Sequence, residues 1–546
     1  MVMVVNLQDF TASNSALNPK RLAPGIGVNA SNLDVRQGDF RGLRAATTAQ
    51  SLSVGSQKNS LYRFGRDTPS DVGIWLTFDN PIDWARILLN SDPKEITILS
   101  GSSLAAPIEI DSDLVDGSVL TAPSYFGRPI GMAIPPTGMV AAVAVAGAGT
   151  SETRVYCTTR VGDAPLSKEG APSPSVTIVC PAGSTVTLSS IPNTPSLDYV
   201  DDGSFHRIYV STGGDFRECG QITYATTTFT DDGVTRGSVL QSGGSATKPT
   251  WLPPATVMVG VTELWAGMLG GVEHDGKRYA TCVPYKHWAW PAEFRRTIPD
   301  KIVGSAKWGQ NWFLATTGKP RVVMGTTPLA MVDSPIYFKQ ACVSKRSVVG
   351  VDHGVCWASA AGLCYHGQKG TLNLTERILT RAQWQALVPE TIIGANWGDW
   401  YVGFYNDGTR RGFMINVNKV EGIIWLTQGA FAVFEDPISE TLFLLDSSNV
   451  VKKWDNGSVA SATFKSKVFR HPQAVSPGAA RVVATTYPLT FSLWADGVLQ
   501  VNARSVTSDA PFRLPCGYVA EEFQVQIVGT GPVEGVFVAE EMADLP

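Results

Sequence analysis

Few side chains in the sequence have the types and the spacing that catalysis or metal binding requires. The six histidines are scattered, and His353 and His366 are the two that could meet across one sheet and bind a metal ion. Glu435 and Asp436 precede Pro437 and could form the carboxylate pair of a glycosidase. For both pairs we favour the plainer interpretation: the histidines lie in or near turns, and the carboxylates are solvated loop charges.

The overall composition excludes several classes of function. Lysine and arginine total 44, aspartate and glutamate total 48, and the net charge is −4. A protein that grips nucleic acid by its phosphates needs a basic surplus, and a disordered protein needs few apolar residues. The sequence therefore predicts a folded protein without a general nucleic-acid-binding surface. We interpret the basic pairs Arg295-Arg296, Lys345-Arg346 and Arg410-Arg411 as solvated loops rather than phosphate clamps.

Neither an export signal nor a membrane span is predicted. Met1 to Val5 has no basic region and too short an apolar run for a signal peptide. Residues 139–148 reach roughly half of the ~20 residues that cross a bilayer, so we expect a buried strand or a linker there. The eight cysteines form no CxxC pair. Cys356 and Cys364 could face each other across a hairpin, but we favour free, buried thiols in a reducing compartment.

Strand patterns dominate the elements that must position these side chains. One clear helix is predicted after Thr380, because Thr380 and Gln383 have the spacing of a capping box and Pro389 ends the run. Elsewhere, short β-branched and aromatic runs alternate with Gly, Asn and Asp turns. This alternation is typical of an all-β protein.

A repeated spacing between turns indicates the architecture. The turns lie in steps of 42, 44, 46 and 41 residues, at Asp275-Gly276, Thr317-Gly318, Ala361-Gly362, Asp407-Gly408 and Ser448-Asn449. A period of roughly 40–47 residues with several strands per unit is typical of the blades of a β-propeller. Residues 74–99 look like one further blade, so we expect five or six blades.

Other segments depart from this period. The region from 150 to 250 has the size and the seven or so short strands of an immunoglobulin-like or fibronectin-type β-sandwich, inserted between blades. Asp496-Gly497 predicts a hairpin within a terminal β-sandwich or an extension of the sheet. We expect the polar first residues to be disordered unless a partner holds them. The predicted parts are an N-terminal arm (1–60), the first part of the propeller (61–148), the inserted sandwich (149–250), the remaining blades (251–460) and a C-terminal β-domain (461–546).

Motifs of known enzyme classes are incomplete or missing from the sequence. Asn406-Asp407-Gly408-Thr409 is a fragment of the Ser-x-Asp-x-Gly-x-x-Trp turn of propeller hydrolases such as sialidases, and we interpret Asp407 as a turn residue. Lys452-Lys453-Trp454-Asp455 resembles the end of a single WD repeat. GxSxG, HExxH and Walker A motifs do not occur. We therefore predict no catalytic, cofactor-binding or metal-binding residues, and we name no partner-binding residues.

Three ordered blocks of the sequence carry a family resemblance. The blocks are Gly260 to Pro291, which contains Glu263-Leu264-Trp265-Ala266-Gly267, Arg278-Tyr279-Ala280 and His287-Trp288-Ala289-Trp290-Pro291; Gln340 to Ser347 with Gly354 to Ser359 and Gly362-Leu363; and Leu379 to Trp384. Lys465 to Phe469 and Arg154 to Pro174 also fit. Over roughly 60–470, the sequence resembles the tail nozzle (tail tubular) proteins of short-tailed bacteriophages and prophages.

This resemblance implies a structural virion component. Such proteins are typically homohexamers below the portal and the head-to-tail adaptor ring, and their propellers form a tube through which genomic DNA leaves. Tail fibres or other tail proteins attach outside. The resemblance also implies a place in the virion tail after assembly in the host bacterial cytoplasm, no membrane insertion and no cofactor. A slightly acidic chain suits DNA transit, because many Lys or Arg contacts would hold the DNA through counterion release.

An alternative function remains open from the sequence. A propeller glycosidase would degrade host-surface polysaccharide and would need a cleft with two carboxylates about 5–9 Å apart. A sugar-binding propeller would instead need exposed aromatic platforms. Most of the tryptophans lie in apolar strands, so we interpret them as core residues.

Overall fold

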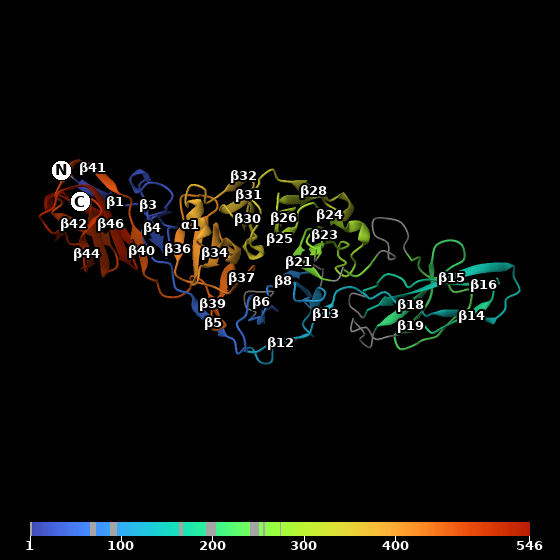
Figure 1. The fold of residues 1–546 in the computed structure, drawn as a ribbon. Coiled ribbons are helices and arrows are strands. Elements are labelled where there is room, and N and C mark those ends of the chain that lie inside the picture. Colours follow the sequence, from blue (N-terminus) through green and yellow to red (C-terminus); the bar gives the residue numbers. More distant parts are fainter. Residues whose placement is uncertain are drawn as a thin grey trace.

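The chain folds into an elongated molecule made almost entirely of β-sheets. The computed structural model describes residues 3–65, 72–87, 95–162, 168–192, 204–240, 251–254, 257–273 and 275–546. Figure 1 shows a β-propeller in the middle, a β-sandwich projecting at one end and both chain termini together at the other. This arrangement confirms the predicted all-β fold class. Among the helices of the described residues, none has the length and apolar character that a membrane crossing requires.

Five sheets of the propeller, called blades 3 to 7 here, share one antiparallel four-stranded plan. Each of the five turns that set the predicted period joins the second strand of a blade to the third, which confirms the period. The strands of blades 3 and 4 are β21 (Met258–Glu263), β22 (Leu269–Glu273), β23 (Arg278–Thr281), β24 (Arg296–Thr297), β25 (Ile302–Trp308), β26 (Asn311–Thr316), β27 (Arg321–Met324) and β28 (Val332–Pro335). Those of blades 5 to 7 are β29 (Val349–Val351), β30 (Gly354–Ala358), β31 (Leu363–Gly367), β32 (Gly370–Asn373), β33 (Ile393–Trp397), β34 (Trp400–Asn406), β35 (Arg410–Asn416), β36 (Ile424–Leu426), β37 (Ala432–Asp436), β38 (Thr441–Leu445), β39 (Val450–Lys453) and β5 (Thr47–Ser51).

The first part of the propeller contains two sheets rather than the single blade expected from the sequence. Blade 1 is the pair β6 (Ser60–Phe64) and β7 (Ile74–Phe78), and blade 2 consists of β8 (Asp83–Arg86), β9 (Thr97–Ser100), β10 (Ile108–Ile110) and β13 (Arg128–Pro129). The short hairpin of β11 (Val115–Asp116) and β12 (Ser124–Tyr125) packs on blade 1 through Tyr125 and Phe78. The expected count was too low because residues 74–99, interpreted as one blade, contribute to two sheets: β7 pairs with β6, whereas β8 and β9 belong to the next sheet. The described residues therefore form seven blades.

The N-terminal segment is not the disordered arm that the sequence suggested. β5 forms the fourth strand of blade 7 beside β39, so an early strand and late strands close the ring. β1 (Met3–Leu7) pairs with β47 (Val533–Ala539), and β4 (Asn29–Ser31) bridges blade 6 to the C-terminal sheets. Two further short strands, β2 (Ala12–Ser13) and β3 (Ile26–Gly27), pair in parallel. The chain itself supplies the partner, through pairings too distant in sequence for a local pattern to indicate.

Alternating burial explains how the blades stack. Successive residues of a strand point to opposite faces of its sheet, so in β30 the Cys356 side chain joins the core between blades 5 and 6, while Trp357 joins the core between blades 4 and 5. Trp357 lies opposite Cys364 in the register, and Cys356 lies opposite Tyr365. Cys356 and Cys364 therefore point to opposite faces and do not pair, and both thiols are free and buried, as favoured from the sequence.

The inserted domain is a sandwich of a three-stranded and a four-stranded sheet. Its strands are β14 (Val140–Val145), β15 (Ser151–Val161), β16 (Val176–Pro181), β17 (Thr185–Ser189), β18 (Phe205–Ser211), β19 (Arg217–Thr223) and β20 (Phe229–Asp231). β14 pairs with β17, so the sandwich begins before the predicted boundary at residue 149. Residues 139–148 were expected to form a buried strand or a linker; a strand is present, but β14 is an edge strand with most of its residues exposed.

The C-terminal domain consists of two sheets that share a core with the propeller. One sheet continues from blade 6 through β4 into β40 (Ala462–Lys465), β46 (Ala520–Gly529), β43 (Leu489–Ala495) and β44 (Val498–Val506), with β41 (Phe469–Val475) also on β46. The other contains β1, β47, β42 (Ala479–Ala484) and β45 (Phe512–Arg513). The predicted hairpin is present, because Asp496 and Gly497 have positive φ between β43 and β44.

Within the described residues, helical structure is limited to short turns. The predicted helix is α1 (Arg381–Gln385), with the capping box of Thr380 and Gln383 formed as expected. Trp384 anchors this helix, since its buried indole donates a hydrogen bond to Ser359 O at 2.8 Å. The described 3-10 turns are η1 (Pro19–Arg21), η3 (Ala292–Phe294), η4 (Pro328–Ala330), η5 (Lys345–Ser347), η6 (Pro389–Thr391) and η7 (Met542–Asp544).

Candidate functional site

The two histidines considered as metal ligands have separate environments. His353 lies exposed in the turn between β29 and β30. His366 is half-buried in β31, where Nδ1 lies 2.7 Å from Thr371 Oγ1 and the ring stacks on Phe313. Burial also lowers the pKa of His366. No group of three or more His, Cys, Asp or Glu side chains in the described residues has a geometry that could hold a metal ion.

Glu435 and Asp436 do not form the carboxylate pair considered from the sequence. They are strand residues of β37, not loop residues, so their side chains point to opposite faces of the blade. Asp436 is buried, with Arg63 Nη1 3.4 Å and Ser439 Oγ 2.8 Å from its Oδ2. Glu435 is an exposed residue, but protein packed around its carboxyl group raises its pKa to about 7, and the carboxylates of Asp352 and Glu440 add to the shift.

The motif residues at the ends of the blades have structural roles. Asp407 accepts a hydrogen bond from Thr409 N and forms an ion pair with Arg411 at 3.1 Å. These contacts agree with its interpretation as a turn residue. Trp454 is buried, and its ring meets Trp397 edge-on with centroids 6.0 Å apart. Asp455 accepts a hydrogen bond from Arg44 N.

The propeller axis is narrow and polar. First strands of successive blades contact one another around it, and the rings of Tyr62 and Trp84, 4.7 Å apart, join blade 1 to blade 2. The axial cavity has a volume of about 290 Å³. Lys345 forms an ion pair with Asp83 across it, and Arg346 donates to Phe431 O at 2.8 Å. Burial lowers the pKa of Arg346 to about 10, so this pair is not the solvated loop expected from the sequence.

A buried ionic cluster fastens the inserted sandwich to the propeller. The Glu109 carboxylate in blade 2 lies 2.5 Å from Lys168 Nζ of the insert and 2.7 Å from His287 Nε2 of blade 3. All three side chains are at most 6% exposed. Burial raises the pKa of Glu109, but the charges of Lys168 and His287 outweigh that effect and hold it well below its usual range. Trp288 Nε1 adds a hydrogen bond to Glu169 O.

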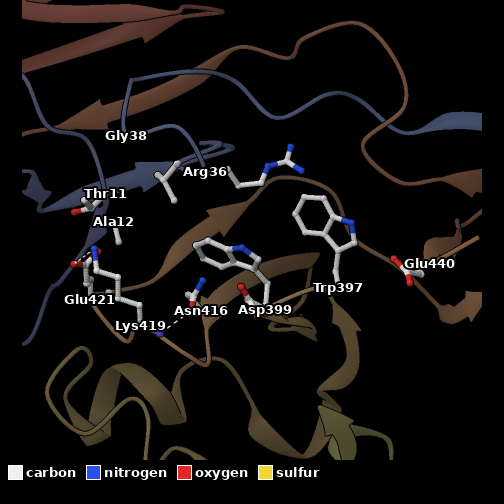
Figure 2. A pocket seen from close by; sticks show the side chains of 14 residues that line it. Thr11, Ala12, Arg36, Gly38, Trp397, Asp399, Asn416, Lys419, Glu421 and Glu440 are labelled. Carbon is white, nitrogen blue, oxygen red and sulfur yellow. Dashed lines mark hydrogen bonds and ion pairs between the residues drawn. The ribbon is translucent and has the colours of Figure 1, made fainter. Parts of the chain in front are cut away.

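A hollow with a mixed aromatic and polar lining lies where blade 6 meets the N-terminal segment (Figure 2). Its volume is about 670 Å³, within the roughly 300–1,000 Å³ of typical ligand pockets. We call it the tryptophan cleft. Its lining residues are Thr11, Ala12, Val35, Arg36, Gly38, Trp397, Gly398, Asp399, Trp400, Asn416, Lys419, Glu421, Gly422 and Glu440.

A tight turn sets the two indoles of the cleft. Trp397 ends β33 and Trp400 begins β34, and the two face each other in the register across Gly398, whose φ is +57°. A side chain at this φ would be strained, so glycine suits the position. Both tryptophans are half-buried. Figure 2 shows Arg36 over Trp397, where its guanidinium carbon is 4.9 Å from the ring centroid.

Ion pairs within the chain neutralise the cations of the cleft. Arg36 Nη2 lies 2.8 Å from Asp34 and 2.8 Å from Asp455, and Lys419 Nζ lies 2.8 Å from Glu421. The cleft is therefore not a basic surface, and its other polar side chains are those of Thr11, Asp399, Asn416 and Glu440.

The cleft residues were missed by the sequence reasoning, which placed the tryptophans in the core. A signal for them is present in the sequence. The Trp-Gly turn at Trp397-Gly398 repeats at Trp308-Gly309 between the first two strands of blade 4, and both glycines have positive φ. A tryptophan at such a turn lies at the rim of a blade rather than inside it.

Comparisons with known proteins give likeness of fold class alone. The sequence matches neither a protein-family model nor a curated protein. The AfRom2 CNH domain is similar over 71% of this chain and 99% of its own, with 9% identity and a TM-score of 0.25. Virginiamycin B lyase from Staphylococcus aureus is similar over 68% of this chain and 98% of its own, with 9% identity and a TM-score of 0.28. Citrobacter koseri AztD is similar over 70% of this chain and 99% of its own, with 11% identity and a TM-score of 0.27. At these scores, the likeness supports no argument about function.

Proposed function

We propose that this chain is a structural subunit of a bacteriophage tail: a nozzle protein that assembles with copies of itself into a ring, hexameric by the family resemblance. In this role it binds the adaptor ring and tail fibres or other tail proteins, conducts genomic DNA during ejection and catalyses no reaction. It assembles in the host cytoplasm and resides in the virion. The observation that carries the proposal is the apolar edge of the projecting sandwich.

This apolar edge consists of β14 and the neighbouring edge strand β16. Val140, Val143 and Val145 on β14 are 52%, 39% and 64% exposed, and Val179 on β16 is 64% exposed. The outer edge of β14 pairs with no strand among the described residues. Proteins usually protect an exposed edge strand with charges, proline or a bulge, because it is a template for pairing with another chain. An edge left apolar is therefore suited to contact with a second copy.

The closed propeller axis supports a particular route for the DNA. A cavity of about 290 Å³ crossed by the Lys345–Asp83 ion pair is far too small for a duplex. In the proposed nozzle, DNA therefore passes through the lumen between copies and not through any single propeller. A lumen wall with few Lys and Arg side chains would not hold the DNA, because few phosphate contacts would release few counterions.

The test is the assembly state of the purified chain. Light scattering coupled to gel filtration, with electron micrographs of the same fractions, should show ring-shaped oligomers that increase with concentration. Val145→Asp should abolish them, because a charge cannot be buried unpaired at low cost. Val498→Asp is the matched control: Val498 is 61% exposed on β44, an edge strand in the C-terminal domain. A chain that stays monomeric at every concentration, or rings that persist in Val145→Asp, would contradict the proposal.

The alternative from the sequence was a glycosidase or a sugar-binding protein. Glu435 and Asp436 point apart and give no support to the glycosidase. The tryptophan cleft favours binding of a saccharide without hydrolysis.

A further inference from the structure

We propose that the tryptophan cleft is a binding site for neutral, hexose-based oligosaccharides. A pyranose ring would lie against the Trp400 indole, and its hydroxyl groups would bind Asp399 and Asn416. This inference stands apart from the nozzle proposal, because it depends on one cleft of a single chain and needs no assembly.

Aromatic surface is the first requirement for such a ligand, and the cleft provides it. The axial and equatorial C–H groups of a sugar ring carry partial positive charge and favour the negative face of an aromatic ring. Trp397 is held from one side by Arg36 and packs on Trp454, which fixes its ring. Trp400 belongs to the partly buried rim of the same core, so its backbone and ring base are rigid.

Oriented polar groups are the second requirement. Asn418 Nδ2 donates to Asp399 Oδ1 at 2.6 Å, and Lys419 N donates to Asn416 Oδ1 at 2.7 Å. These bonds fix both side chains, yet they leave Asp399 Oδ2 and the Asn416 amide group available. A carboxylate oxygen accepts from a hydroxyl, and an amide NH₂ donates to one, so together they suit adjacent sugar hydroxyls. Neither indole nitrogen of the cleft donates a hydrogen bond within the described residues.

Charge selects a neutral ligand over a phosphate-bearing one. Arg36 and Lys419 are each paired with carboxylates of this chain. Asp399 and Glu440 add negative charge that would repel a nucleic acid or another polyanion. Arg36 already occupies the Trp397 face, so an organic cation such as choline would have to use the Trp400 face, and choline is therefore a competing ligand in the test.

Blade 4 provides an internal comparison. Its turn has the same Trp-Gly pair at Trp308-Gly309, but Asn311 begins the next strand where blade 6 has Trp400. Trp308 packs edge-on against His366, with the ring centroids 6.0 Å apart. Blade 6 therefore differs from blade 4 in having a second tryptophan at this turn, which makes Trp400 the residue to test.

The experiment is saturation-transfer NMR and titration calorimetry on the full chain. The probes are maltopentaose, cellopentaose and chitopentaose, with choline chloride and a thymidine decanucleotide as competing ligand classes. At least one pentasaccharide should bind, and Trp400→Ala should weaken that binding by roughly fivefold or more, as loss of an aromatic contact implies. Trp308→Ala, the matched control, should leave it unchanged.

A second variant separates loss of the site from loss of the fold. Asp399→Ala changes an exposed side chain and should weaken binding while circular dichroism and the melting temperature stay those of the wild type. The proposal is overturned if no pentasaccharide binds, if binding survives both Trp400→Ala and Asp399→Ala, or if choline or the oligonucleotide binds in the cleft instead. None of these results depends on whether the chain forms rings.

Discussion

Replacement of Glu109 by glutamine should loosen the inserted sandwich from the propeller. The Glu109 carboxylate is the counterion that Lys168 and His287 share, at 2.5 and 2.7 Å, and all three groups are buried. Glutamine keeps the shape of the side chain but removes its charge, so Lys168 would remain buried without its main counterion. Breaking one partner of a buried pair costs about 3–5 kcal/mol. At the lower end, this is a factor of roughly 150 in the opening equilibrium.

Hydrogen–deuterium exchange with mass spectrometry measures this opening directly. In Glu109→Gln, peptides that span 168–173 and 283–290 should lose protection by about two orders of magnitude, while blade 6 peptides should not change. Glu218→Gln is the matched control within the insert, because Glu218 pairs loosely with Arg207 at 3.4 Å and should cost under about 1 kcal/mol. Adding Lys168→Met to Glu109→Gln should restore much of the protection, since the unpaired charge is then gone. Unchanged exchange in Glu109→Gln would refute the reasoning.

Three further predictions concern pH and thiol chemistry. The pKa of Glu109 is held well below its ordinary 4.5, so its contribution to stability is fully present above pH 4.5 and is lost progressively as the pH falls from 4.5 toward the lowered pKa. Protection of 168–173 should therefore decline progressively below pH 4.5 in the wild type, with a steeper decline than in Glu109→Gln. The pKa of Glu435 is raised to about 7, so ionisation of its carboxyl group opposes folding. As the pH rises from 4.5 to 7, the melting temperature of the wild type should therefore fall relative to that of Glu435→Gln. Melting temperatures that change in parallel with pH in the two proteins would contradict this prediction. Iodoacetamide should label Cys516 alone in the folded chain, because the other seven cysteines are buried, and mass spectrometry that finds a second label would show the core is open.

Local signals in the sequence were sufficient for the repeated part of the fold. Turn residues such as Asp275-Gly276 and Asp407-Gly408 act within a few residues of themselves, and all of the predicted turns occur in the same place in their blades. The capping box at Thr380 is likewise a contact between near neighbours. The sequence could therefore predict the propeller, the inserted sandwich and the one helix.

Long-range pairings account for what the sequence could not predict. β5 and β39 are far apart in the sequence, and the residues of β5 show no pattern that indicates β39 as their partner. The exposure of β14 was missed because valine and alanine runs are usually buried, and only the sheet order shows that this strand is an edge. Glu435 and Asp436 were interpreted as solvated loop charges, but they lie in β37, where neighbouring side chains point to opposite faces.

Closure of the ring by β5 has a consequence for synthesis. On the ribosome, residues 47–51 emerge long before blade 7, the only sheet in the described structure that receives them. Until then the nascent propeller is an open arc with unsatisfied strand edges at both ends. A chain released before residue 450 would keep these edges unpaired, and unpaired strand edges favour aggregation.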